Sequence, residues 1–149
     1  MAVEIERKFL VDRDLLPDLF EGLTIKQVYV FIEDDKHMRV RLDNEARITI
    51  KMGSDALSRQ EFEYNIPYAD AVDMIEKLPN PRIISKIRYK LEVAGKKWEI
   101  DVFGGANKGL VMAEVELESA NETFFRPDWA SKEVTHDYRY LNVNLAKRK

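Results

Sequence analysis

Charged and apolar residues alternate from the start of the chain. The first such segment, "VEIERKFLV" at 3–11, places Glu4, Glu6 and Lys8 at every second position. Residues two apart on a β-strand project from the same face, so these side chains would line one face of a strand. Grouped carboxylates are typical ligands of hard divalent cations, whereas grouped ammonium and guanidinium groups bind phosphate. The segment therefore has the residue types for a metal or phosphate site.

Later segments show the same alternation, and most carry charges of nearly one sign. The basic positions are Lys8, Arg39, Arg41, Lys51, Lys86 and Arg88, and the acidic positions are Glu4, Glu6, Glu61, Glu63, Asp101, Glu114 and Glu116. A single strand of this kind is usually the solvent-exposed side of an antiparallel sheet. Exposed faces normally mix the two signs, however, whereas here basic and acidic strands are separate and nearly balance each other. This segregation favours charged faces that meet around one cavity.

The alternation predicts strands at 3–11, 24–32, 36–42, 46–52, 59–66, 82–93, 96–103 and 110–118. A helix is predicted at 67–79, a shorter one within 12–22, and one or two more in the tail from 121 onward. Short turns between the strands favour antiparallel pairing, and eight strands can close into a barrel with room for one small ligand. We therefore predict a mainly β fold of the α+β class: an eight-stranded antiparallel barrel with a charged interior and a few external helices, forming one domain over 1–149.

The enclosed charges indicate what such a barrel would bind. Buried charges must be paired or must coordinate metals, and crowded carboxylates raise one another's pKa unless a cation lies between them. Oxygen ligands of this kind suit Mg²⁺ or Mn²⁺. Arg and Lys side chains from several strands can hold a linear chain of phosphates from several sides. The charge set thus predicts a site for a divalent metal and a polyphosphate, although alternation alone does not decide which face points inward.

The composition excludes several other classes of function. A net charge of −3 argues against nucleic-acid binding, and the absence of cysteine excludes a disulfide framework or a thiolate–zinc site. That absence also fits a cytoplasmic protein. Two histidines are too few for a histidine-rich metal site, and no apolar run approaches the 18 residues of a membrane span. Neither GxxxxGK[ST] nor GxGxxG occurs, so phosphate would not be bound by a glycine-rich loop.

An ordered series of motifs covers essentially the whole chain. After "EIERKFLV" come "RVR" at 39–41, "TIK" at 49–51, "SRQEFEY" at 58–64, "KIRYK" at 86–90, "WEIDVF" at 98–103, "AEVELE" at 113–118 and "EVTHDYRYLNVNLA" at 133–146. In this order they resemble the CYTH superfamily of triphosphate tunnel metalloenzymes, whose N-terminal signature is ExExK. The resemblance implies an eight-stranded tunnel with its charged faces inward. It also implies metal-dependent hydrolysis of inorganic triphosphate, as in small bacterial members.

The resemblance also implies roles for individual residues. The metal, Mg²⁺ or Mn²⁺, would be held by Glu4, Glu6, Glu114 and Glu116, with Asp101 as a further ligand. The triphosphate would be held by Lys8, Arg39, Arg41, Lys51, Lys86 and Arg88. Glu61 or Glu63 would orient the attacking water, Lys86 would assist catalysis, and Tyr29 is a further catalytic candidate. One departure concerns Tyr29, because Val28 stands where related sequences often have glycine.

Several alternatives share these residues. The same tunnel could hydrolyse thiamine triphosphate or cyclise ATP as a class IV-type adenylate cyclase. A protein of another class, a non-catalytic polyphosphate-binding module, would be expected to lose its carboxylates and keep its cations. The partner expected is a small-molecule triphosphate, with no nucleic acid and no membrane, and the apolar strand faces favour a homodimer. His37 and His136 are predicted to have no role, His37 as a surface residue, and Trp98 and Trp129 are predicted to pack outside the tunnel.

Overall fold

A nine-stranded antiparallel sheet makes up most of the structure, a computed structural model that describes residues 3–146. The strands are β1 (Val3–Val11), β2 (Leu23–Ile32), β3 (Lys36–Leu42), β4 (Ala46–Met52), β5 (Ser58–Ile66), β6 (Arg82–Val93), β7 (Lys96–Phe103), β8 (Val111–Glu116) and β9 (Ala130–Glu133). The helices are α1 (Tyr68–Lys77) and α2 (Asn142–Leu145), with 3₁₀ turns at Arg13–Leu15, Gly105–Asn107 and Tyr138–Tyr140. The eight predicted strands are all present, with bounds shifted by a few residues at most.

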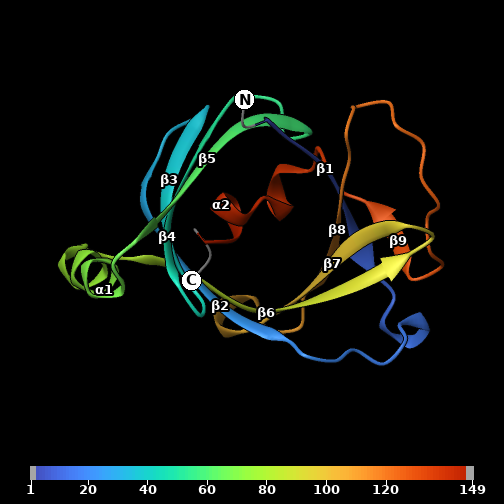
Figure 1. Cartoon of the computed structure of the whole chain (residues 1–149), viewed down its shortest axis with the longest axis horizontal. Helices are drawn as coiled ribbons and strands as arrows, with labels where there is room; N and C mark the ends of the chain where they lie inside the picture. The colour runs from blue at the N-terminus through green and yellow to red at the C-terminus, as the bar shows by residue number, and fades with distance from the viewer. Residues whose placement is uncertain (1–2, 147–149) are drawn as a thin grey trace.

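The sheet closes through β1. The strand order is β5-β4-β3-β2-β6-β7-β8-β1-β9, and an additional pairing joins β5 to β1. One edge of β1 pairs with β8, while its other edge pairs first with β5 and then with β9. Eight strands therefore form a closed antiparallel barrel, which confirms the predicted fold (Figure 1). The ninth strand was not predicted, since "ASKE" is short and its last three residues are exposed and polar.

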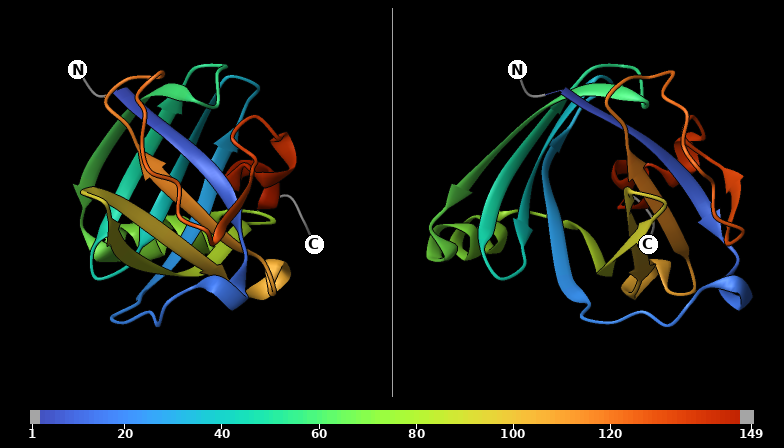
Figure 2. Two further views of the ribbon diagram at one scale, coloured as in Figure 1. Left: turned by 90° about the vertical axis from the view of Figure 1, so that its right-hand side faces the viewer. Right: turned by 45° about the vertical axis from the view of Figure 1, so that its right-hand side comes forward.

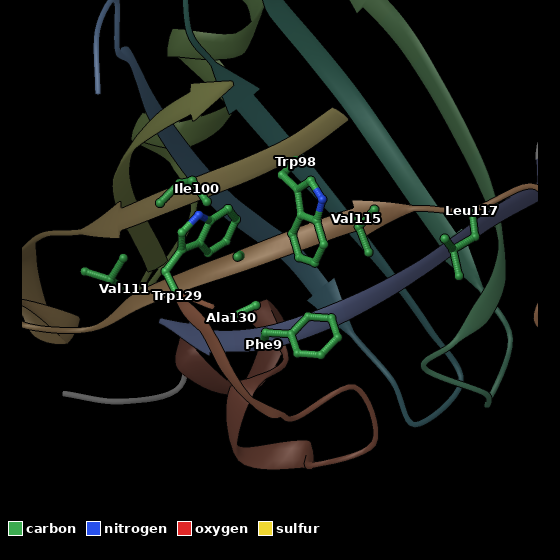
Figure 3. Close-up of a cluster of buried hydrophobic side chains, with 9 residues drawn as sticks. Phe9, Trp98, Ile100, Val111, Val115, Leu117, Trp129 and Ala130 are labelled. Carbon is green, nitrogen blue, oxygen red and sulfur yellow. The ribbon is translucent and has the colours of Figure 1, made fainter. Parts of the chain in front are cut away.

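An apolar cluster covers the outer face of β1, β7 and β8. Phe9, Trp98 and Val115 project outward from these strands and pack beneath the segment 117–130 (Figure 3). The Trp98 ring lies 5.2 Å from Trp129 and 5.6 Å from Phe9, measured between ring centroids. Trp98 is fully buried and Trp129 nearly so, which confirms that both tryptophans pack outside the barrel. This cluster fixes the orientation of the strands, so their alternate residues must point inward.

The helices lie outside the barrel, except for the last one. Helix α1 packs its buried Ala71 against Val40 and Ala46 of β3 and β4, close to the predicted bounds (Figure 2). The helix predicted within 12–22 is wrong, because only the 3₁₀ turn Arg13–Leu15 forms there. Pro17 restricts the residue before it to extended conformations, so Leu16 leaves the turn with a ψ of 137°.

One end of the barrel is filled by the C-terminal segment. At this end the inward positions are apolar: Tyr29, Ile84, Phe103 and Met112 pack against Leu145 of α2. Figure 1 shows α2 within the ring of strands. The barrel is therefore closed by a plug of apolar side chains, and the predicted short helices of the tail are the 3₁₀ turn Tyr138–Tyr140 and α2.

The outer faces of β2 and β6 remain partly uncovered. Phe31, Ile83 and Ile87 are 41%, 38% and 37% exposed. These exposed apolar side chains are compatible with a dimer interface, and the homodimer stays a prediction. Within residues 3–146, no helix is long and apolar enough to cross a membrane.

Candidate active site

Alternate residues of the barrel strands project into its interior, and their burial deepens toward the plug. On β6 the exposed fraction of the side chain falls from 11% at Arg88 to none at Lys86. On β7 it falls from 34% at Glu99 to 2% at Asp101. The interior is thus open at one mouth, and charged groups near the plug are withdrawn from water.

Carboxylates gather on one wall, formed by β5, β1 and β8. A hydrogen bond joins the carboxyl groups of Glu4 and Glu61, and another joins Glu6 and Glu114. Burial and the hydrogen bond to Glu4 raise the pKa of Glu61 to about 7. Burial and the charge of Glu6 likewise raise the pKa of Glu114. In each pair one carboxyl is more readily protonated than an isolated one, because two carboxylates at close range repel each other unless a cation lies between them.

Two lysines lie beside these carboxyl pairs. The Lys8 Nζ is 3.4 Å from Glu6 Oε1 and 3.9 Å from Glu114 Oε1. The Lys51 Nζ is 2.8 Å from Glu4 Oε1 and 3.5 Å from Glu61 Oε2. Burial alone would raise the pKa of Glu4, but Lys51, the Glu61 carboxyl and Lys8 together outweigh it and hold that pKa well below its usual range. The lysines thus stabilise the ionised member of each pair.

Asp101 has a different surrounding from the other predicted metal ligands. Its carboxylate accepts two hydrogen bonds from Arg88, at 2.7 Å and 2.8 Å, and lies 2.7 Å from the Lys86 Nζ. Burial opposes its ionisation, but these two cations hold its pKa well below the usual range. Burial also lowers the pKa of Lys86, to about 8. Both Asp101 oxygens are occupied here, so its geometry suits a residue that orients cations; metal binding by Asp101 stays a prediction.

Arg39 and Arg59 project into the barrel without a carboxylate partner. Among the described residues neither guanidinium has an ion pair, and the buried Nε atom of each lacks a hydrogen-bond acceptor. Arg41, nearer the mouth, is paired with Asp43 at 3.1 Å. Burial and the charges of Arg88 and Arg39 lower the pKa of Arg41. Guanidinium groups that repel one another and lack counterions form a site with a demand for an anion.

Two further inward residues, Arg59 and His37, were not predicted for the site. Arg59 lies two residues before Glu61 and shares its face, so the spacing could have identified it. The prediction that His37 lies on the surface is wrong, since it is only 6% exposed. His37 is already the second residue of β3, and it shares the inward face with Arg39. His136 is exposed, and its Nε2 lies 3.2 Å from Asp55 Oδ1.

The remaining candidates divide between the interior and the mouth. The Tyr29 hydroxyl is buried, and no hydrogen-bond partner is found for it among residues 3–146. Glu63 is exposed and accepts a hydrogen bond of 2.8 Å from the buried Thr49. Glu116 is exposed as well and lies opposite Glu6 in the β1–β8 register. Around the mouth, a cavity of about 650 Å³ is lined by residues that include Arg41, Arg47, Arg88 and Lys90.

The donor set fits a hard divalent cation, although the side chains are not grouped around one point. Among the described residues, no set of three or more carboxylate or histidine groups stands in a metal-binding arrangement. The two carboxyl pairs nevertheless offer only oxygen donors, as Mg²⁺ and Mn²⁺ prefer. A divalent cation between the members of a pair would offset the repulsion between their carboxylates. Glu4, Glu6, Glu61 and Glu114 therefore fit the metal that such a site requires.

The raised pKa of Glu61 predicts a pH-dependent effect of the Glu61→Gln change on stability. The ordinary value is 4.5 and the folded pKa is about 7, so the folded carboxyl keeps a proton that the unfolded chain releases. This contribution to stability is complete below pH 4.5 and is lost as the pH rises through 7. Because glutamine does not ionise, the variant should gain stability relative to the wild type between pH 4 and 8. Urea unfolding at both pH values measures this, and an equal difference at both would contradict it.

Comparisons with known proteins agree with this architecture. A family model described as CYTH domain matches residues 2–148. An inorganic triphosphatase of Acetivibrio thermocellus is 45% identical over 99% of this chain and 95% of its own. Another, from Nitrosomonas europaea, is 34% identical over 96% of each chain. A crystal structure of an inorganic triphosphatase superposes with a TM-score of 0.70 at 33% identity, covering 98% of this chain and 95% of that one. The chain belongs to the CYTH family.

Proposed function

We propose that this protein hydrolyses inorganic triphosphate to pyrophosphate and phosphate inside the barrel, with Mg²⁺ or Mn²⁺ as its cofactor. The observation that carries the proposal is an interior in which the acidic wall of β5, β1 and β8 meets buried basic side chains, of which Arg39 and Arg59 have no ion pair among the described residues. Phosphoryl transfer needs positioning and neutralisation of charge more than covalent chemistry. A site of this kind supplies both. The two curated relatives described above are inorganic triphosphatases, which supports the same substrate class here.

The basic residues would hold the phosphate chain. Arg39 and Arg59 are free of carboxylates, so they can bind phosphate oxygens without first breaking an ion pair. Three other cations already have carboxylate partners and would be shared between these and the phosphates. They are Lys8, at 3.4 Å from Glu6, Lys51, at 2.8 Å from Glu4, and Arg88, at 2.7 Å from Asp101. Arg41 lies at the mouth and would hold the outermost phosphate. With unpaired guanidinium groups inside and Arg41 at the mouth, the phosphate chain would lie along the barrel axis, with one end buried and the other near solvent.

The metal would be held by the acidic wall. Glu4, Glu6 and Glu114 are the inner ligands in this proposal, and Glu116 would complete the set from the mouth. When bound, a divalent cation neutralises phosphate oxygens and lowers the pKa of a coordinated water. Glu61 is our candidate for orienting that water, because a pKa of about 7 lets its carboxyl accept a proton near neutral pH. Glu63, which is exposed and bound to Thr49, would then support the strand rather than act on water.

Lys86 would act on the leaving phosphate. Its ammonium is completely buried, lies 2.7 Å from Asp101 and has a pKa lowered to about 8. A lysine of this kind is protonated at neutral pH and still gives up a proton readily. Asp101 would fix the position of Lys86 and Arg88. Tyr29, whose hydroxyl faces the same interior, would donate a hydrogen bond to a phosphate oxygen.

The proposed function is tested by phosphate release from three substrates. Tripolyphosphate, ATP and thiamine triphosphate are each incubated with Mg²⁺, Mn²⁺ or EDTA. We expect tripolyphosphate to be hydrolysed fastest, with no release in EDTA. Preferred turnover of thiamine triphosphate, or cyclic AMP as the product from ATP, would replace the substrate assignment. Tight tripolyphosphate binding without hydrolysis in any metal would identify a binding module instead.

A further inference from the structure

His37 lies inside the barrel, close to the plug, and its ring is surrounded by cations. It pairs with Lys51 in the register of β3 and β4 and shares its inward face with Arg39. Its ring packs edge-on against Tyr29, with 5.3 Å between ring centroids. The ring nitrogen Nε2 is buried and has no hydrogen-bond partner within the described part of the chain. A buried polar atom without a partner costs free energy, so its retention indicates a ligand that completes it.

The unpartnered atoms around His37 converge on one small cavity. This cavity is lined by Lys8, Tyr29, His37, Arg39, Lys51, Arg59 and the start of α2 with its N-cap, residues 141–143. Its volume is about 10 Å³, enough for a single oxygen atom or water molecule. Besides His37 Nε2, the Tyr29 hydroxyl and the Nε atoms of Arg39 and Arg59 are buried there without acceptors. Four groups that can donate hydrogen bonds thus surround a space the size of one oxygen atom, which suits one oxygen of an anion.

The interior charges that face His37 come from four strands: Arg39 lies on its own strand, Lys51 on β4, Arg59 on β5 and Lys8 on β1. Strand β2 contributes the Tyr29 ring and no charged group. On the solvent side, a second cavity that includes His37 is lined by Glu33, Asp34 and Asp35 of the preceding turn, by Lys36 of β3 and by Tyr138. Burial and the four interior cations lower the pKa of His37 to about 3. The ring is therefore neutral in the empty barrel at physiological pH.

We propose that His37 is a phosphate-binding residue of the triphosphate site, which takes up a proton from solvent when an anion arrives and then donates it in a hydrogen bond to a phosphate oxygen in this cavity. The inference rests on the proposed function, because the anion is the terminal phosphate of the substrate chain. An anion offsets the repulsion from the four cations and supplies the acceptor that Nε2 lacks. Binding of the phosphate chain at the plug end thereby becomes coupled to one proton.

This coupling predicts an affinity that depends on pH. If the bound complex titrates about three units above the free protein, the histidine contributes about a tenfold gain at pH 5, about twofold at pH 6 and none at pH 8. Protonation of the phosphate chain itself also changes with pH. That change affects all variants equally, so it cancels in the ratio of wild-type to variant affinity.

Two measurements test the proposal on the metal-free protein in EDTA, where tripolyphosphate binds without turnover. The first follows the ring signals of the two histidines by NMR as the pH is varied, with and without saturating tripolyphosphate. We expect the titration midpoint of His37 to rise by about three units when the anion binds, as the affinity gain at pH 5.5 requires. The second measures tripolyphosphate affinity by calorimetry for wild type and His37→Gln at pH 5.5 and 8. We expect the variant to bind several-fold more weakly at pH 5.5 and about equally at pH 8.

His136→Gln is the matched control, because His136 is exposed and paired with Asp55 away from the cavity. It should keep wild-type affinity at both pH values. If tripolyphosphate binds but leaves the His37 titration unchanged, the role of His37 is overturned and the proposed function stands. If tripolyphosphate does not bind the metal-free protein, the role of His37 in holding the anion is overturned, whereas the proposed function, which is metal-dependent, stands or falls by the phosphate-release assay. The NMR titration uses the wild-type protein, so it decides the matter even if His37→Gln fails to fold.

Discussion

Glu6→Gln is expected to reduce metal-dependent tripolyphosphate hydrolysis by about a hundredfold or more while leaving the fold intact. Removing one preorganised electrostatic group from an active site typically costs about 10²–10³ in kcat. Glu6 is 7% exposed, hydrogen-bonded to the Glu114 carboxyl and 3.4 Å from Lys8, so its charge is set deep in the interior. Glutamine keeps the shape and removes one anionic ligand. The phosphate-release assay, repeated over a range of Mg²⁺ and Mn²⁺ concentrations, measures the loss.

The metal titration separates a ligand from a residue that only maintains structure. Loss of an anionic ligand should raise the metal concentration needed for half-maximal activity, in addition to lowering the maximum. The matched control is Glu76→Gln, which neutralises an exposed glutamate on α1, outside the barrel. It should behave as wild type. Full activity of Glu6→Gln at the usual metal concentration would remove Glu6 from the metal site and leave Glu4 and Glu114 as the candidates.

The barrel could be predicted from sequence because one simple pattern repeats. Each barrel strand except β2 places charged side chains inside, and the apolar faces pack outward, so the period of two identified nearly all strand residues. β9 was not predicted because its four residues show no such alternation of charged and apolar side chains. It forms because β5 diverges from β1 after Ile5 and leaves an edge of β1 for another strand. The free edge of β1 results from the three-dimensional arrangement of the strands and leaves no pattern in the sequence.

The site could be predicted in its residue types but not in its partners. The pairing of Arg88 with Asp101 depends on the register of β6 and β7, in which the two residues lie directly opposite. The plug depends on apolar residues at inward positions of several strands, such as Ile84, Phe103 and Met112. Each of these alone looks like ordinary strand composition. His37 was misplaced for a related reason: a polar residue at the start of a strand gives no sign of whether a C-terminal segment covers it.

Arg39→Met is expected to increase stability and to abolish most of the activity. Arg39 is 5% exposed and has no ion pair among the described residues. Near it are the Tyr29 hydroxyl and the Glu4 carboxyl group. Burial of an incompletely compensated charge costs several kcal/mol, and replacing buried charges by apolar residues of similar volume is often stabilising by about 1–4 kcal/mol. The same substitution removes a phosphate-binding group, so kcat/KM for tripolyphosphate should fall about a hundredfold.

Arg88→Met is the matched variant, since it makes the same change at another arginine that projects into the barrel. Arg88 holds Asp101 through two hydrogen bonds of 2.7 Å and 2.8 Å, and its loss leaves that buried carboxylate with Lys86 alone. Breaking one side of a buried ion pair costs about 3–5 kcal/mol, less where another cation remains, so this variant should be destabilised. Urea unfolding and tripolyphosphate kinetics on both variants give the comparison. If the two variants change the free energy of unfolding in opposite directions and both lose activity, Arg39 is retained for binding the anion and not for the fold. Destabilisation by Arg39→Met would instead show a structural partner for Arg39 and weaken its assignment to phosphate.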